Sequence, residues 1–254
     1  MQTSIGIMLD KITAILSGNN PSIYLFGSVV LDDFKLGWSD IDIICLTERQ
    51  MTIQQAEELV GLRQSLLLDY PGNLYFRSFE GGFITWNAFL KKEKDCVVYW
   101  GTSGQRITDA YHFDPFSTME LLTCGKLLYG PDHRERIAYP ARDEIVHAVK
   151  EHYDTIRRYA KETSKSLYSA GWLLDIARCL YTLKSNDIIA KTQAGKWAIE
   201  NKLVPDVEMM QRVIHIRENP MTAKADEETL DWLASLGPHI QQFANVLGVW
   251  LNIV

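Results

Sequence analysis

Two short motifs near the start of the chain combine residue types that can bind a metal ion and a phosphate. Gly27-Ser28 follows an apolar run, and after an interval of eleven residues comes Asp40-Ile41-Asp42. Side chains two apart on a strand share a face, so Asp40 and Asp42 are expected side by side. A divalent cation would relieve their repulsion, and such oxygen ligands suit Mg²⁺. Because Gly27 allows close approach and Ser28 can hydrogen-bond a phosphate oxygen, the pattern predicts a nucleoside-triphosphate site.

Each motif alone has a simpler interpretation. An isolated Asp-x-Asp is commonly a solvated loop edge, and an isolated Gly-Ser indicates only a turn. Their order along the chain, with strand, Gly-Ser, polar loop and strand bearing Asp-x-Asp, is far more specific. Short apolar runs bounded by turn residues predict these strands at 23–26 and 41–46.

The other elements expected in the N-terminal half are two helices and further strand segments. Helical spacing of apolar residues and the turn residues that follow predict helices at 3–17 and 53–69. Apolar segments at 74–79 and 83–86 flank Gly81-Gly82, and residues 96–100 add a strand. The N-terminal half is therefore expected to be an α/β domain with a mixed sheet and flanking helices.

From Phe116 onward no strand is expected, and helical periodicity dominates. One helix contains residues 119–128 and ends at Gly130; the later helices are predicted at 142–163, 167–183, 187–201, 206–218 and 224–250. This pattern predicts an all-α helical bundle. We place the domains at residues 1–138 and 139–254.

Composition limits the class of function. The 254 residues carry 26 Lys and Arg against 32 Asp and Glu, a net charge of -6, which argues against nucleic acid as a partner and favours a cationic small molecule. No apolar run reaches the ~18 residues that cross a bilayer, so no membrane partner and a cytoplasmic location are expected. The four cysteines form no Cys-x-x-Cys pair, and we interpret them as small buried hydrophobes without a disulfide or zinc role.

The block GSVVLDDFKLGWSDIDI, residues 27–43, resembles the signature of the nucleotidyltransferase superfamily related to DNA polymerase β. Within that superfamily the chain is similar to the bacterial streptomycin and spectinomycin adenylyltransferases, which join a nucleotidyltransferase domain to a C-terminal helical bundle. The similarity also includes KLLYGPD at 126–132 and the stretch 169–199. The resemblance implies a Mg-dependent adenylyltransferase that moves AMP from ATP to a hydroxyl group and releases pyrophosphate.

The resemblance also implies roles for individual residues. Asp40 and Asp42 match carboxylates that hold two Mg²⁺ ions, and Glu80 matches the catalytic base. Arg178 and Lys191 match the residues of the helical domain that bind the triphosphate, which Gly27 and Ser28 are also expected to contact. Glu80 could instead be a surface glutamate in a turn, and Arg178 could be solvated or paired with Asp175.

The acceptor is expected to be a small, cationic, hydroxylated molecule. Counting back from Arg178, Tyr159, Ser164 and Tyr168 stand where streptomycin-accepting relatives carry a tryptophan and acidic residues, so streptomycin is not favoured. An aminocyclitol antibiotic such as spectinomycin is expected, with a lincosamide or a protein or RNA target of the toxin–antitoxin type as alternatives. Trp86, Trp100 and Tyr159 are candidates for packing against the substrate rings. We expect a monomer.

Overall fold

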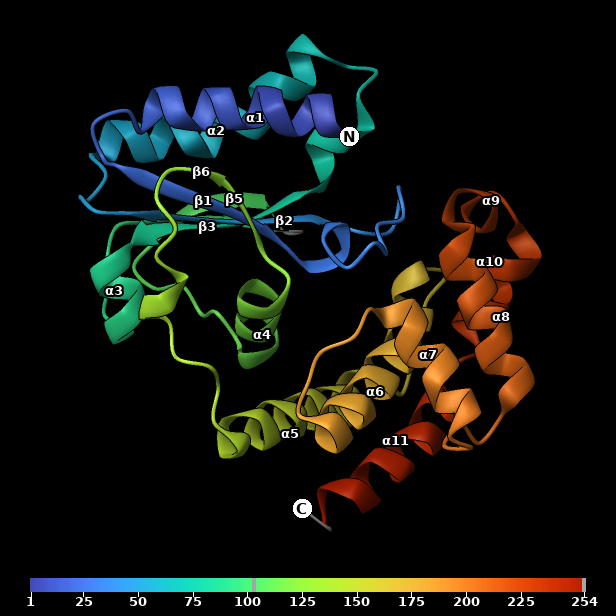
Figure 1. The fold of residues 1–254 in the computed structure, drawn as a ribbon. Helices are drawn as coiled ribbons and strands as arrows, with labels where there is room; N and C mark the ends of the chain where they lie inside the picture. Colours follow the sequence, from blue (N-terminus) through green and yellow to red (C-terminus); the bar gives the residue numbers. More distant parts are fainter. Residues whose placement is uncertain (102–103, 253–254) are drawn as a thin grey trace. The chain divides into compact units, whose positions relative to one another are not determined.

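The computed structural model describes residues 1–101 and 104–252. Two compact units emerge from the contacts along the chain (Figure 1). The sheet unit comprises residues 1–34, 39–113 and 120–139. The helical unit comprises residues 140–254 together with 35–38 and 114–119. Each unit is described separately below.

The sheet unit contains a six-stranded sheet in the order β5-β4-β3-β2-β1-β6. Strands β2 and β3 are parallel, while the other neighbouring pairs are antiparallel. This confirms the mixed α/β class. The strands are β1 Pro21–Phe26, β2 Ile41–Thr47, β3 Phe79–Thr85, β4 Val97–Gly101, β5 Gly104–Thr108 and β6 Lys126–Tyr129.

Helices cover both faces of this sheet (Figure 1), because the central strands are apolar on both sides. On one face α1 and α2 pack over a core that includes Ile23, Ile43 and Phe83. On the other face, a second core joins Tyr24 and Ile44 of the sheet to α3 and α4. The helices are α1 Gln2–Ile15, α2 Ile53–Asp69, α3 Trp86–Lys91 and α4 Pro115–Thr123.

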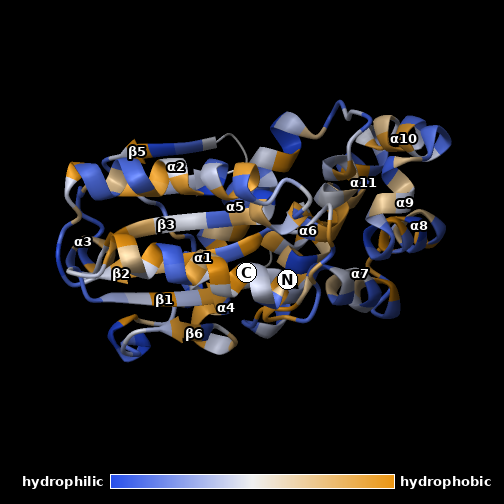
Figure 2. Cartoon of the chain, turned by 90° about the horizontal axis from the view of Figure 1, so that it is seen from above, coloured by the Kyte–Doolittle hydropathy of each residue, from blue (hydrophilic) through white to orange (hydrophobic). Residues whose placement is uncertain are grey.

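Helix α2 begins and ends where its sequence indicates. Thr52 and Gln55 form a capping box, in which Thr52 Oγ1 accepts a hydrogen bond from the Gln55 backbone N–H at 3.2 Å. Apolar and polar segments alternate along the helix in Figure 2, as expected for a surface helix with one buried face. The bounds of α2 match the prediction.

The segment around Gly81-Gly82 differs from the prediction. Residues 74–78 form a short 3₁₀ helix, and β3 runs without a break through both glycines. Gly81 has φ +150°, and a Cβ there would overlap the carbonyl oxygen of Ile43 on β2. The glycines therefore permit close strand pairing rather than a turn.

The predicted helix over 119–128 and the absence of later strands were wrong. Helix α4 ends at Thr123, and β6 follows and pairs with β1. At the end of α4, a Cβ on Gly125 would overlap the Leu121 carbonyl oxygen, so the chain needs a glycine where it leaves the helix. The apolar residues of 126–129 therefore belong to an edge strand of the sheet and not to the face of a helix. Strand β5 was also not predicted.

The helical unit is a bundle around one large apolar core. Most helices begin and end near their predicted limits, but the predicted helix over 224–250 divides into two helices, α10 and α11, and a short helix, α9, ends at Lys224. Asp226 caps α10, and Gly237-Pro238 begins α11, so local capping and proline interrupt the apolar period. The helices are α5 Arg142–Tyr159, α6 Leu167–Ser185, α7 Lys191–Glu200, α8 Val207–Glu218, α9 Pro220–Lys224, α10 Glu227–Ala234 and α11 Gly237–Leu251.

The cysteines are free thiols. Cys45 and Cys179 are buried as predicted, whereas Cys96 and Cys124 are half-buried. None of the helices within residues 1–101 and 104–252 has both the length and the apolar composition to cross a membrane.

Candidate active site

Adjacent strands of the sheet unit bring three predicted carboxylates together. Asp40 directly precedes β2, Asp42 lies within it, and Glu80 is the second residue of β3. In the parallel pairing of these strands, Asp42 is opposite Glu80 and Ile41 is opposite Phe79. The three carboxylates are half-buried, whereas Ile41 is fully buried. Alternation along β2 therefore separates the polar positions from the core.

Glu80 is a strand residue, not part of a surface turn. Its cross-strand position opposite Asp42 follows from the continuous strand through Gly81-Gly82. A carboxylate at this place can accept a proton from a group held beside Asp42. The turn interpretation of Glu80 is therefore excluded.

The backbone at Gly27 fits closely against the Asp42 carboxylate. Phe26 pairs with Asp42 at the end of β1, and Gly27 then starts a short 3₁₀ helix with φ +68°. A Cβ at Gly27 would overlap Asp42 Oδ2 and lie 2.9 Å from Asp42 Cγ. Ser28 Oγ donates a hydrogen bond to the Asp40 carbonyl oxygen at 3.2 Å. The two motifs found in the sequence therefore form one structural site.

The donor set at this site suits a hard divalent cation. Mg²⁺ in nucleotide enzymes is held by one or two carboxylates, and water and phosphate oxygens complete its coordination. Asp40 and Asp42 supply two such carboxylates, and the missing side chain of Gly27 leaves room for the Asp42 carboxylate. Within the described residues, no group of three or more His, Cys, Asp or Glu side chains forms a candidate metal cluster. The residues present fit a cation bound jointly by protein and nucleotide.

Sequence reasoning missed one cation near these carboxylates. Arg63 on α2 is 8% exposed, and its Nη1 donates to the Phe79 carbonyl oxygen at 2.8 Å. Burial lowers the pKa of Arg63, and the negative charges of Glu80 and Asp40 oppose that shift. An arginine among the buried leucines of α2 was the available signal, since it interrupts an apolar stripe.

In the helical unit, Arg178 and Lys191 meet at one carboxylate. Arg178 lies on α6, Lys191 is the first residue of α7, and Asp175 lies one turn before Arg178. Asp175 Oδ1 is 2.9 Å from Lys191 Nζ and 3.9 Å from Arg178 Nη2. The structure thus contains the ion pair between Arg178 and Asp175 that was one alternative, and the same carboxylate also holds Lys191.

The surroundings of Asp175 favour its charged form. Burial raises the pKa of the carboxyl, but the charges of Lys191 and Arg178 more than offset this, so the pKa lies below its ordinary value. The Arg178 guanidinium also lies 5.3 Å from the centre of the Phe116 ring. Two cations are therefore held at one place in the helical unit, where an anionic group could bind.

His152 belongs to this cluster and was not identified from the sequence. Its ring packs edge-on against Phe116 at 5.1 Å. Burial lowers the pKa of His152, with Asp175 opposing and Arg178 adding to that shift. No sequence spacing links His152 to α6, so this neighbourhood depends on helix packing.

The side chains that the sequence links to substrate binding or substrate choice fall into two groups. Trp86 and Trp100 are 1% and 0% exposed and belong to the cores of the sheet unit, so that prediction was wrong. Tyr159 and Tyr168 are 63% and 59% exposed at the end of α5 and the start of α6. Ser164, in the connection between these helices, is also exposed. These three side chains can be reached by a ligand.

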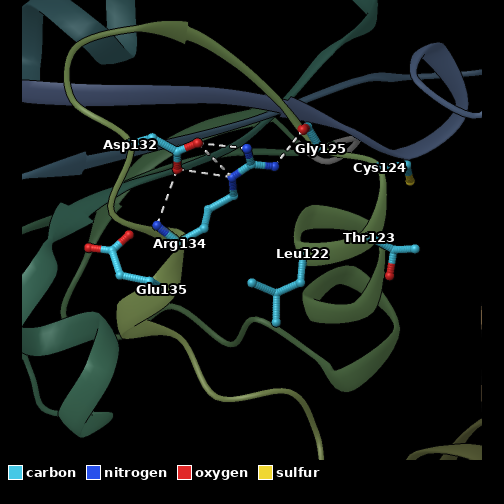
Figure 3. Close-up of a pocket in the computed structure, with 7 residues that line it drawn as sticks. All are labelled: Leu122, Thr123, Cys124, Gly125, Asp132, Arg134 and Glu135. Carbon is cyan, nitrogen blue, oxygen red and sulfur yellow. Dashed lines mark hydrogen bonds and ion pairs between the residues drawn. The ribbon is translucent and has the colours of Figure 1, made fainter.

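The segment 126–132 builds a polar corner of the sheet unit. Arg134 Nη2 is 2.6 Å from Asp132 Oδ2, and Arg134 Nη1 donates to the Gly125 carbonyl oxygen at 2.6 Å (Figure 3). These hydrogen bonds from Arg134 lower the pKa of Asp132 to about 2. The hollow that they line measures about 610 Å³ and opens to solvent. Because its arginine is already paired with a carboxylate, we assign this corner a structural role.

Comparisons with known proteins agree with this architecture. Residues 9–79 match the nucleotidyltransferase domain family, and residues 140–234 match the C-terminal domain family of aminoglycoside adenylyltransferases. The fold is similar to the crystal structure of spectinomycin adenyltransferase AAD(9) from Enterococcus faecialis with ATP and spectinomycin. The TM-score is 0.59 at 16% identity, covering 95% of this chain and 97% of that one. No match was found among curated proteins.

Proposed function

We propose that the protein transfers AMP from ATP to a hydroxyl group of an aminoglycoside-type molecule, because residues 9–79 match the nucleotidyltransferase domain family and residues 140–234 match the C-terminal domain family of aminoglycoside adenylyltransferases. The observation that carries the proposal is the pairing of Asp42 with Glu80, with Gly27 fitted against the Asp42 carboxylate. That arrangement sets a cation ligand and a potential base on adjacent strands, with the backbone of a glycine against the cation ligand.

Glu80 is the proposed catalytic base. The acceptor oxygen attacks the α-phosphorus of ATP, the bond from that phosphorus to the β-bridging oxygen breaks, and pyrophosphate leaves. The acceptor proton passes to a Glu80 carboxylate oxygen, which requires a separation of roughly 3 Å in the substrate complex. Burial of the flanking core positions fixes the backbone of Glu80 and so its direction of approach.

Asp40 and Asp42 are the proposed ligands of Mg²⁺, and the family resemblance implies two ions. When bound, Mg²⁺ neutralises charge on the phosphates and lowers the pKa of the acceptor hydroxyl. Ser28 contributes by holding the Asp40 carbonyl, which fixes the start of β2. Gly27 leaves its backbone open to a phosphate oxygen.

Arg178 and Lys191 are the proposed ligands of the β- and γ-phosphates. Both cations lie beside the Asp175 carboxylate, so a triphosphate that binds them either displaces this carboxylate or shares the two cations with it. A guanidinium and an ammonium at one place suit a multiply charged anion. We propose that the protein has two domains, residues 1–138 and 139–254, and that it acts as a monomer.

For the acceptor we propose an aminocyclitol such as spectinomycin. The matched relative was crystallised with ATP and spectinomycin. The exposed side chains of Tyr159, Ser164 and Tyr168 carry no negative charge to pair with a strongly cationic streptomycin. A lincosamide, or a protein target modified by the same chemistry, is the second candidate.

Pyrophosphate release tests the proposal. Purified protein is incubated with ATP, Mg²⁺ and spectinomycin, streptomycin or lincomycin, and the product is identified by mass spectrometry. We expect an AMP adduct of spectinomycin, and we expect its rate of formation to fall by at least about 100-fold in Glu80→Gln. Glu57→Gln is the matched control, because Glu57 is exposed on α2. Equal rates in Glu80→Gln and wild type would refute the role of the base.

A second result separates substrate from mechanism. If ATP binds but none of the three compounds leads to release of pyrophosphate, these acceptors are rejected and a protein target is favoured. Labelled ATP would then be expected to mark a protein. Loss of ATP binding in Arg178→Gln or Lys191→Gln is expected in either case, because both are assigned to the triphosphate.

A further inference from the structure

Arg178 is held in the helical unit by an aromatic ring as well as by a carboxylate. The central carbon atom of its guanidinium lies over the Phe116 ring, 5.3 Å from the ring centre. A cation within about 6 Å of a ring centre is attracted by the negative face of the ring. The Arg178 side chain is 16% exposed. Because water is largely excluded, the cation–π attraction is stronger here than at an exposed site.

The Phe116 ring is itself fixed by its surroundings. Phe116 is the second residue of α4, is 3% exposed and belongs to the apolar core of the helical unit. The His152 ring of α5 packs edge-on against it, with 5.1 Å between the ring centres and 79° between the ring planes. Aromatic rings prefer this arrangement. Phe116 therefore offers Arg178 a rigid surface, because the ring cannot turn away without opening a close-packed core.

The Asp175 carboxylate holds Arg178 in a different way. Asp175 Oδ1 is 2.9 Å from Lys191 Nζ but 3.9 Å from Arg178 Nη2. The first distance is that of a charge-assisted hydrogen bond, whereas the second is too long for a hydrogen bond. Asp175 therefore attracts the guanidinium, but this ion pair by itself does not set the direction of the guanidinium N–H groups.

The two partners of Arg178 also differ in what they leave available to an anion. A carboxylate accepts hydrogen bonds from a guanidinium, so it competes with phosphate oxygens for the same donors. A phenyl ring has no lone pair, so a guanidinium held over it keeps its N–H donors for a ligand. A side chain that is already in place also loses less conformational freedom when the ligand binds. Phe116 can therefore raise the affinity for an anion without competing with it.

We propose that Phe116 is a positioning residue, which holds the Arg178 guanidinium in place for the β- and γ-phosphates of ATP. The inference rests on the proposed function, which assigns Arg178 to these phosphates. Phe116 does not touch the nucleotide in this scheme and acts only through Arg178. Removal of the ring should therefore weaken the binding of a nucleoside triphosphate and spare the binding of a nucleotide that lacks the β- and γ-phosphates.

Equilibrium binding of two nucleotides to the full chain tests this role. Isothermal titration calorimetry with Mg²⁺ compares α,β-methylene-ATP, which cannot be cleaved to AMP and pyrophosphate, with AMP. In Phe116→Met, which replaces the ring by another large apolar side chain, we expect the Kd of α,β-methylene-ATP to rise about 3–30-fold. The Kd of AMP should change by less than about twofold. An unchanged Kd of α,β-methylene-ATP, or an equal rise for both nucleotides, would overturn the proposal.

Phe243→Met is the matched control. Phe243 lies on α11, belongs to the same apolar core and is 0% exposed, so its replacement also costs packing in the helical unit. In urea unfolding this variant should lose stability as Phe116→Met does, but it should bind α,β-methylene-ATP as tightly as wild type. A rise in Kd as large as that in Phe116→Met would show that loosened packing is the cause, and it would overturn the role of Phe116.

Pentafluorophenylalanine at position 116 decides the question if Phe116→Met does not fold. This residue keeps the shape of the ring, but its fluorine atoms withdraw negative charge from the ring face, so the attraction for a guanidinium is lost. A rise in the Kd of α,β-methylene-ATP by at least about threefold would support the proposal, and a wild-type Kd would overturn it.

Arg178→Gln separates this inference from the proposed function. If Arg178→Gln binds α,β-methylene-ATP as tightly as wild type, Arg178 is not a phosphate ligand, and both its assigned role and the role of Phe116 are rejected. If Arg178→Gln weakens binding but Phe116→Met does not, only the role of Phe116 is rejected, and the assignment of Arg178 to the triphosphate stands.

Discussion

Replacing Gly27 with alanine should damage the site with little change elsewhere. Gly27 has φ +68°, a conformation that costs a residue with a side chain about 1–2 kcal/mol. The new Cβ would lie 2.9 Å from Asp42 Cγ and overlap Asp42 Oδ2. Carbon atoms in ordinary contact are ~3.5–4.0 Å apart, so the Asp42 carboxylate must shift by roughly 0.6–1 Å or more.

A displacement of that size has a measurable effect on rate. A misplacement of about 1 Å at a reacting centre can cost about 100-fold, so we expect kcat for AMP transfer to fall by about that factor in Gly27→Ala. The unfolding free energy should fall by about 1–2 kcal/mol from backbone strain alone. Steady-state pyrophosphate release and urea unfolding measure the two effects on the same preparation.

Gly61→Ala provides the control. A Cβ at Gly61 meets nothing within 4 Å, and the residue lies inside α2, where alanine is favoured over glycine by roughly 0.5–1 kcal/mol. That variant should be as active as wild type and slightly more stable. A Gly27→Ala protein with the wild-type rate would show that Asp42 is not held where the reaction needs it, and the assignment of this site would be rejected.

Two further substitutions test the ion pairs of each unit. Asp175→Asn removes the carboxylate between Lys191 and Arg178 and should lower the unfolding free energy by roughly 1–3 kcal/mol at neutral pH. Asp154→Asn, which removes the exposed pair of Asp154 with Lys150, is the control. An equally small change of the unfolding free energy in both variants would contradict the role of Asp175. Because the pKa of Asp132 is lowered to about 2, its stabilising charge is present above the unfolded pKa of ~3.9 and is lost as pH falls through about 2. The difference in Tm between wild type and Asp132→Asn should therefore be constant from pH 7 to 5 and shrink below pH 4, and a constant difference down to pH 2.5 would refute it.

The parts of the fold that follow local rules could be predicted from the sequence. The bounds of α2 depend on a capping box and on the residues after it, and the β1 and β2 strands on apolar runs with clear ends. Errors arose where a partner decides the structure. The segment 126–129 is apolar enough for a helix but pairs with β1, and Gly81-Gly82 suggests a turn until β2 is seen to need close approach.

The candidate site shows the same division between local and long-range information. Asp40, Asp42, Gly27 and Ser28 were predictable because one strand, one loop and a second strand contain them all.

Asp175, His152 and Arg63 could not be assigned fully in that way: the pair of Asp175 with Arg178 is local, but each of the three also contacts a residue on another element. Each is ionisable and at least partly buried, and each has a charged neighbour that shifts its own pKa or that of the neighbour. Burying a titratable residue on the apolar stripe of an amphipathic helix has a cost, which opposite charge must offset. Such charges are commonly found at functional sites, so a titratable residue in this place of a sequence indicates a candidate site residue. In this chain Arg63 interrupts the leucine stripe of α2, and the opposite charge that acts on it belongs to Glu80 and Asp40.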